Sequence, residues 1–230
     1  MRVVEKGDRT MKIDQVFPDD GARQAIEQAC RGNTVAVRDA IAQGWDVNAP
    51  GEGGITPLIY ALSQTSVSGV RTLLAAGADP NRPMEGGHTA ASLATRLEDP
   101  AFLKILLEHG VDPNTRVNDR PLSFTAAGQG RWANVRLLLD SGADINALSE
   151  NGDTMAMEAA FVGEYDVLLK LLKAGADAKI PAAGGATVAG VIGRARPEPN
   201  STPGILHRRV IDELRARGVR VEEPEQPAGQ

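Results

Sequence analysis

The chain has 230 residues and a formal net charge of −5, and 42% of its residues are hydrophobic but only 3% are aromatic. The negative charge argues against non-specific nucleic-acid binding, which needs a basic surface, and the single cysteine, Cys30, cannot form an internal disulfide. No apolar run approaches the ~20 residues of a membrane span, so we expect no membrane insertion.

The N-terminal stretch, residues 1–20, is charged and has no regular apolar pattern, so we expect a flexible leader. Residues 21–53 then show apolar positions at helical spacing on two consecutive short helices, separated by Gly32 and Asn33. The Thr-Pro pair that opens the next segment is absent from this one, which is typical of a repeat that caps one end of an array.

The segment that begins at Ile55 shows the complete unit of the pattern. Thr56 suits the N-cap of a helix, and Pro57 suits the first helical position, where no backbone N–H is needed. A second apolar helix ends at Gly77, since glycine adopts the left-handed conformation of a helix terminus without a Cβ clash. The turn formers Asp79 to Asn81 follow, so the unit is a cap, two short antiparallel helices and a tight turn.

The same unit recurs along the chain, and its closing glycines lie 33, 33, 32, 33 and 43 residues apart. These glycines are Gly44, Gly77, Gly110, Gly142, Gly175 and Gly218. A period of about 33 residues with this internal order of cap, helices and turn is the ankyrin signature. The chain resembles the ankyrin-repeat family over nearly its whole length, from about Ala22 to Val221.

The resemblance implies an all-α fold, an ankyrin-repeat solenoid of about six helix–turn–helix repeats linked by hairpin turns, within residues 21–221. The expected repeats are 21–53, 54–86, 87–117, 118–151, 152–184 and 185–221. The sixth contains a Pro-rich insert, residues 194–203, whose three prolines argue against a helix there. This insert is either a tolerated loop insertion without a function or a second contact with the partner. The acidic tail, 222–230, is expected to be disordered.

No catalytic constellation is visible in the sequence. His88, His109 and His207 fall at unrelated points of the repeat, and no paired cysteines or phosphate-binding glycine loop occur. The recurrent Asp-x-Asn pairs shape one turn per repeat, whereas calcium needs six or more converging oxygens. We therefore expect no enzyme activity, no metal site and no cofactor.

Partner binding is the expectation that the resemblance supports. In ankyrin-like proteins the hairpin tips and the first helix of each repeat line a concave face. The partner-binding candidates are Phe161, Val162, Gln129, Arg96, Leu97, Gln64, Tyr60, Glu85, Glu150 and Glu198. Phe161 and Val162 stand out because they form an apolar pair where polar residues would suffice. The alternative is that Phe161 packs onto the neighbouring repeat as part of the core.

The expected function is recognition of one protein partner by a monomer without chemistry of its own. The chain is similar to bacterial ankyrin-type immunity proteins, which neutralise a secreted antibacterial phospholipase toxin such as a type VI secretion effector. This resemblance implies occlusion of the toxin in the periplasm if a signal peptide has been removed; otherwise we expect the cytoplasm. The alternative function is a general ankyrin scaffold or regulator, for example in stress defence.

Overall fold

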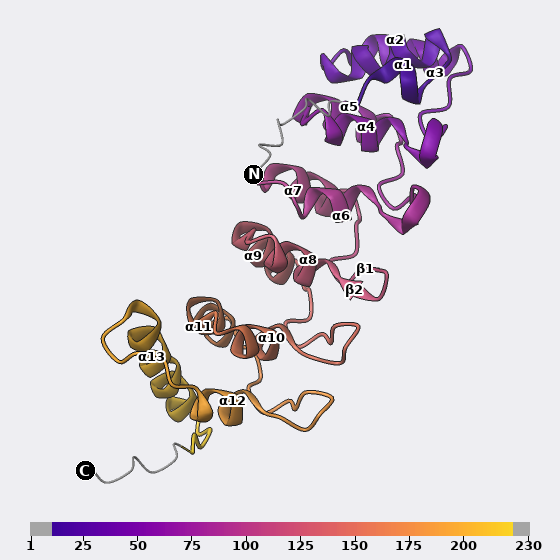
Figure 1. Cartoon of the computed structure of the whole chain (residues 1–230). Helices are drawn as coiled ribbons and strands as arrows, with labels where there is room; N and C mark the ends of the chain where they lie inside the picture. The colour runs from indigo at the N-terminus through magenta and orange to yellow at the C-terminus, as the bar shows by residue number, and fades with distance from the viewer. Residues whose placement is uncertain (1–10, 223–230) are drawn as a thin grey trace, which may run out of the picture. The chain divides into compact units, whose positions relative to one another are not determined.

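The structure is a computed structural model that describes residues 11–222, and these residues form short helices joined by turns (Figure 1). The chain divides into two units, residues 11–118 with 125–142 and residues 119–124 with 143–222. Over the described residues, no helix combines the length and apolar character needed to cross a bilayer.

The first unit contains pairs of antiparallel helices, and each pair is one repeat (Figure 1). Its elements are α1 (Ile13–Val16), α2 (Asp20–Cys30), α3 (Thr34–Ala42), η1 (Glu52–Gly54), α4 (Pro57–Ser63), α5 (Val67–Ala75), η2 (Glu85–Gly87), α6 (Ala90–Ala94), α7 (Ala101–Glu108), β1 (Arg116–Val117), the later part of α8 (Leu122–Gly128) and α9 (Trp132–Asp140). First helices pack on first helices, as α4 does on α6, and second helices pack in the series α5, α7, α9. Their contact faces are fully buried leucines and isoleucines, including Leu73, Ile105 and Leu138.

The second unit repeats this arrangement with fewer helices. Its elements are β2 (Arg120–Pro121), the start of α8, α10 (Met155–Val162), α11 (Tyr165–Lys173), α12 (Val188–Arg194) and α13 (Thr202–Ala216). The first helices α10 and α12 pack together, and the second helices α11 and α13 pack together. Met157, Leu172, Ile192 and Leu214 are buried at these contacts.

The predicted caps and closing glycines are confirmed. The hydroxyl of Thr56 accepts a hydrogen bond from the backbone N–H of Ile59 at 3.2 Å, and Thr89, Thr154 and Thr187 cap their helices in the same way. All six closing glycines have positive φ, between 71° and 105°. Because an added Cβ at these six positions would meet no atom within 4 Å, the backbone conformation, and not space, accounts for glycine there.

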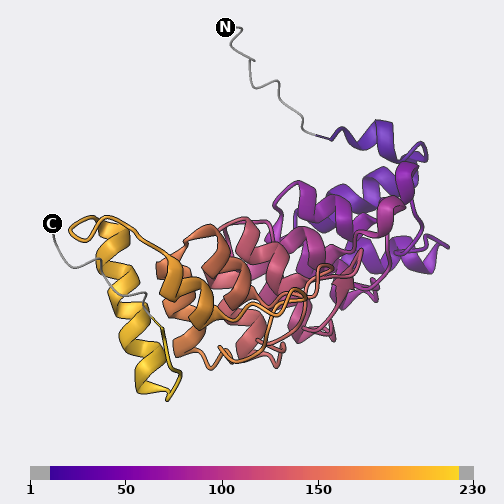
Figure 2. The ribbon, with the colours of Figure 1, turned by 60° about the horizontal axis from the view of Figure 1, so that its bottom comes forward.

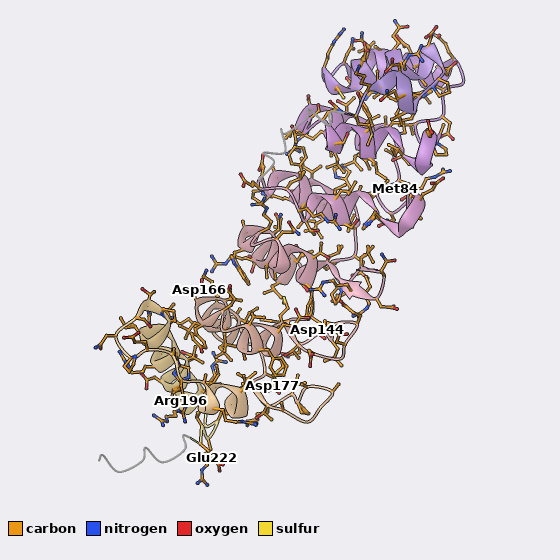
Figure 3. The ribbon with its side chains drawn as sticks, in the orientation of Figure 1. Met84, Asp144, Asp166, Asp177, Arg196 and Glu222 are labelled. Carbon is orange, nitrogen blue, oxygen red and sulfur yellow. The ribbon has the colours of Figure 1, made fainter. Side chains whose placement is uncertain are left out.

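The Asp-x-Asn pairs shape one turn per repeat, as predicted, and the structure shows that they also connect consecutive repeats. The side chain of Asn48 donates to the carbonyl of Gly77 at 3.1 Å and accepts from the N–H of Asp79 at 2.7 Å. In the second unit, Asn146 accepts from the N–H of Asp177 at 2.8 Å, and Asp144 and Asp177 begin successive hairpin loops (Figure 3). These side chains therefore satisfy backbone groups of the neighbouring turn.

The structure differs from the expected flexible leader at residues 13–17. These residues form α1 and the turn after it, and Val16 and Phe17 are both buried at 4% exposure. The ring of Phe17 meets that of Tyr60 edge to face, with 5.9 Å between centroids. Burial of this apolar pair anchors a segment whose sequence is otherwise charged. Residues 1–10 lie outside the described residues.

The expected insert 194–203 is only in part a loop. Arg194 ends α12, and Thr202 and Pro203 lie in the first turn of α13, where proline is tolerated. The helix α13 has 15 residues against nine in α11, so part of the surplus length extends this helix (Figure 2). The expectation that the prolines exclude a helix throughout this segment is therefore wrong at its C-terminal end.

The remaining loop, residues 195–201, folds back onto the helices beside it. Arg208 donates to the carbonyl of Pro199 at 2.7 Å, and Arg196 donates to the carbonyl of Gly193 at 2.8 Å (Figure 3). A Cβ on Gly204 would collide with the carbonyl of Glu198, so only glycine permits this close approach. The expected tail, apart from Glu222, lies outside the described residues.

Asn134 connects two repeats of the first unit through a buried side-chain amide. It is fully buried, and its Nδ2 lies 2.9 Å from the carbonyl of Leu97, 3.2 Å from that of Thr95 and 3.3 Å from that of Ala94. These carbonyls lie at the end of α6 and just after it, and Ala94 and Thr95 are fully buried. We expect Asn134→Ala to reduce the free energy of unfolding by about 2 kcal/mol, because buried acceptors lose their donor. Urea unfolding measures the change.

The matched control is Arg136→Ala, an exposed position on the same helix, which should change stability by less than ~0.5 kcal/mol. An Asn134→Ala protein as stable as this control would contradict the bridging role.

Removal of the sixth repeat tests the dependence of α11 on α13. Truncation after Lys179 uncovers Leu168, Leu171 and Leu172, whose side chains are at most 2% exposed. We expect a thermal midpoint several degrees lower and concentration-dependent association, since these apolar faces would meet water. Calorimetry and size-exclusion chromatography measure both effects. A truncated protein that stays monomeric with an unchanged midpoint would show that α13 is dispensable.

Candidate partner-binding surface

One face of α10 carries exposed apolar side chains beside a charged one. Phe161 is 53% exposed and Val162 is 73% exposed, and both lie in the last turn of the helix. Glu158 precedes them by three and four residues, which places all three on neighbouring positions of the helix surface. The other residues of α10 are buried, so this face is the part of the helix that reaches solvent.

Arg120 holds the charged side of this face in place. Its Nη1 lies 2.7 Å from Oε1 of Glu150, and its Nη2 lies 3.5 Å from Oε2 of Glu158. The guanidinium carbon also sits 5.5 Å from the ring centroid of the buried Phe124. A guanidinium held by a carboxylate on one side and an aromatic face on another loses much of its rotamer freedom.

We call this group the α10 surface: Arg120, Glu150, Glu158, Phe161 and Val162. All five residues belong to the second unit. The ionic part contains one guanidinium and two carboxylates, so it carries an excess of one negative charge at neutral pH.

The environment raises the pKa of Glu158. Burial is the largest cause, because it disfavours the ionised carboxylate, and the negative charges of Glu150 and Asp153 act in the same direction. Arg120 and the hydroxyl of Ser149 oppose the shift and do not cancel it. The folded protein therefore disfavours the ionised form of Glu158 relative to water.

The candidates predicted from the sequence do not form one site. Phe161, Val162 and Glu150 come together on the α10 surface, and Glu198 is exposed in the loop before α13 of the same unit. The other candidates lie in the first unit. Arg96 and Gln129 are exposed just after the ends of α6 and α8. Leu97 is half-buried, and Glu85 is exposed in η2.

Two of the predicted partner-binding residues contact another part of the chain. Tyr60 is only 8% exposed and packs edge to face on Phe17, so the fold buries most of this side chain and leaves little of it open to a partner. The side-chain amide of the half-buried Gln64 donates to the carbonyl of Met11 at 3.1 Å. Both side chains are covered for the same reason: residues 11–17 pack on α4, which the sequence did not predict.

Arg120 and Glu158 are not among the partner-binding residues predicted from the sequence, although each departs from the repeat pattern. Arg120 stands where Thr56, Thr89 and Thr154 open the other repeats. Glu158 is a charged residue in a first helix, whereas α4, α6 and α8 contain none. These departures were signals, but their proximity depends on tertiary structure.

The acidic, histidine and cysteine side chains of the described residues are of the types that bind metal ions, but they form no group suited to holding one. The Nε2 of His207 lies 2.8 Å from the carbonyl of Ile192, and the Nδ1 of His109 lies 2.8 Å from that of Ile105, so each imidazole donates to the backbone.

Comparison with known proteins identifies the family. A model described as "Ankyrin repeats (3 copies)" matches residues 88–182, and one described as "Ankyrin repeat" matches residues 53–84. Together they cover more than half of the 230 residues, and the chain belongs to the ankyrin-repeat family. Ankyrin repeats form scaffolds that bind other proteins. No curated protein sequence matches the chain.

The fold is shared with solved structures. An ankyrin repeat domain from Acinetobacter baumannii is similar with a TM-score of 0.69 and 23% sequence identity, over 86% of this chain and 98% of that one. At this identity the likeness establishes the ankyrin fold alone.

The pKa of Glu158 predicts an unusual pH dependence of stability. A raised pKa in the folded state means that ionised Glu158 destabilises the fold above that pKa, and that this effect is absent below ~4.3, the value for an unfolded Glu. We expect Glu158→Gln to raise the thermal midpoint slightly at pH 7 and to have little effect near pH 4. Calorimetry of both proteins across this range measures it, with exposed Glu164→Gln as the matched control. A thermal midpoint lowered by Glu158→Gln at pH 7 would mean that the ion pair with Arg120 outweighs the cost of burying the carboxylate.

Proposed function

We propose that the protein binds one protein partner through the α10 surface and acts by occluding it. The observation that carries this proposal is the exposure of Phe161 and Val162 beside the fixed Arg120 cluster. The exposed part of a large aromatic side chain contributes nothing to folding, but it supplies a strong anchor when a partner buries it.

The surface has the composition of an interface centre. An apolar pair is bordered by charged side chains that are already oriented, so little further side-chain ordering is needed on binding. Thr154 caps the N-terminus of α10 by accepting from the N–H of Met157, and Gly163 ends the helix in the left-handed conformation. The anchor therefore sits on a regular helix, which holds its side chains more reproducibly than a loop does.

The resemblance to ankyrin-type immunity proteins makes a secreted phospholipase toxin the first partner to test. For such a toxin, a standard interface of ~800 Å² per partner can block access to the active site. Support for this choice comes from the resemblance, and the periplasmic location depends on it too. The second candidate is a scaffold or regulator, which would use the same surface with a different partner.

Phe161→Asp tests the proposal directly. Because Phe161 is more than half exposed, we expect the folded structure to survive, with a thermal midpoint within about 3 °C of the unchanged protein. A charge in the buried centre of an interface should weaken partner binding by about 2–4 kcal/mol. The measurement is affinity capture from cells of the source organism with both proteins as bait, followed by mass spectrometry and titration of each purified partner.

Val35→Asp is the matched control, since Val35 is a 63% exposed apolar residue on α3 of the first unit. A true partner is retained by the unchanged protein and by this control, and is lost from Phe161→Asp. If every retained partner bound Phe161→Asp with undiminished affinity, the α10 surface would not be the binding site. A phospholipase toxin that bound none of the three proteins would leave only the scaffold or regulator as a candidate.

A further inference from the structure

The two carboxylates of the α10 surface are unequally paired. Glu150 lies within hydrogen-bonding distance of Arg120, at 2.7 Å, whereas the shortest separation between Glu158 and Arg120 is 3.5 Å. Good charge-assisted hydrogen bonds fall at about 2.7–2.9 Å, so Arg120 is committed mainly to Glu150. Within the described residues, the structure shows Glu158 no basic partner other than Arg120.

Glu158 is nevertheless accessible. A third of its side chain, 34%, remains exposed, and it shares the helix surface with Phe161 and Val162. Side chains at this spacing on a helix are neighbours at roughly 5–6 Å between Cβ atoms. A Lys or Arg side chain of a partner can therefore lay its aliphatic stem along Phe161 while its charge reaches the carboxylate. The ring face also attracts a cation directly.

We propose that the α10 surface selects a partner segment in which a Lys or Arg side chain stands next to an apolar one. The apolar side chain packs on Phe161 and Val162, and the cation pairs with Glu158. Two carboxylates and two cations then alternate across the contact. This inference rests on the proposed function, because it specifies the chemistry of the partner that docks on the α10 surface.

Other partner chemistries fit this surface less well. An acidic segment would bring a third carboxylate toward Glu150 and Glu158, and such like-charge contacts are strongly unfavourable once water is excluded. A wholly apolar segment would cover Glu158 without supplying a counter-charge, and burying an ionised group unpaired is also costly. A cation supplies the counter-charge and so turns the exposed carboxylate into a favourable part of the contact.

The test uses a phage-displayed library of random dodecapeptides and the full chain. Peptides are selected on the unchanged protein and depleted on Phe161→Asp, so that those remaining depend on the α10 surface. We expect them to be enriched in Lys or Arg adjacent to Leu, Ile, Val or Phe. The best peptides are then synthesised with the cation kept or replaced by norleucine, which preserves the aliphatic stem.

Affinities for both peptides are measured on the unchanged protein, on Glu158→Gln and on Glu164→Gln. We expect Glu158→Gln to weaken the cationic peptide about tenfold, equivalent to ~1.4 kcal/mol, and to leave the norleucine peptide within about twofold. Glu164→Gln, which changes an exposed carboxylate at the start of α11, should not discriminate between the peptides. Circular dichroism confirms that each variant is folded.

Two results would overturn the inference in distinguishable ways. Selected peptides that depend on Phe161 but show no cation, or bind Glu158→Gln unchanged, would refute the chemistry assigned to the partner and leave the docking surface intact. A library that yields no peptide dependent on Phe161 would count against the docking surface itself, and the inference would fall with it.

Discussion

Each repeat of this protein can bury the apolar faces of its helices only against a neighbouring repeat. A pair of helices of seven to nine residues, such as α4 and α5, has no core of its own. In the first unit the second helices pack in series, and Leu73, Ile105 and Leu138 are fully buried as a result. The polar contacts follow the same rule, because Asn48 and Asn134 satisfy backbone groups of the adjacent repeat. Stability and the spacing of the turns therefore have the same origin.

This constraint also determines which positions are available for function. Residues that face a neighbour must be apolar or matched to a backbone partner, whereas the outer face of each first helix is under no such requirement. On α10 that face bears Glu158, Phe161 and Val162. In the repeat before it, Arg120 replaces the usual threonine, and its guanidinium bonds Glu150 and covers the ring of Phe124. The site thus arises where the repeat pattern is broken without disturbing the packing.

Glu158 illustrates the opposition between stability and binding. Its raised pKa shows that the folded protein disfavours the ionised carboxylate, chiefly through burial. A neutral residue would suit the fold better, whereas the charge is what the proposed selection of a cationic partner requires. Phe161 makes a related compromise, since 53% of it remains exposed to water in the folded protein.

The sequence by itself determined the family, the helix caps and the closing glycines, because threonine, proline and glycine act through local backbone geometry. It also indicated Phe161 and Val162, since an apolar pair outside the core pattern is visible in the residues. Only the tertiary structure decided that Phe17 covers Tyr60, that Pro203 belongs to α13, and that Arg120 meets Glu150 and Glu158. Arg120 and Glu150 are thirty positions apart and Phe17 and Tyr60 more than forty, so no local rule relates them. Such contacts join residues far apart in the sequence, and the packing of the helices within each unit determines which residues meet.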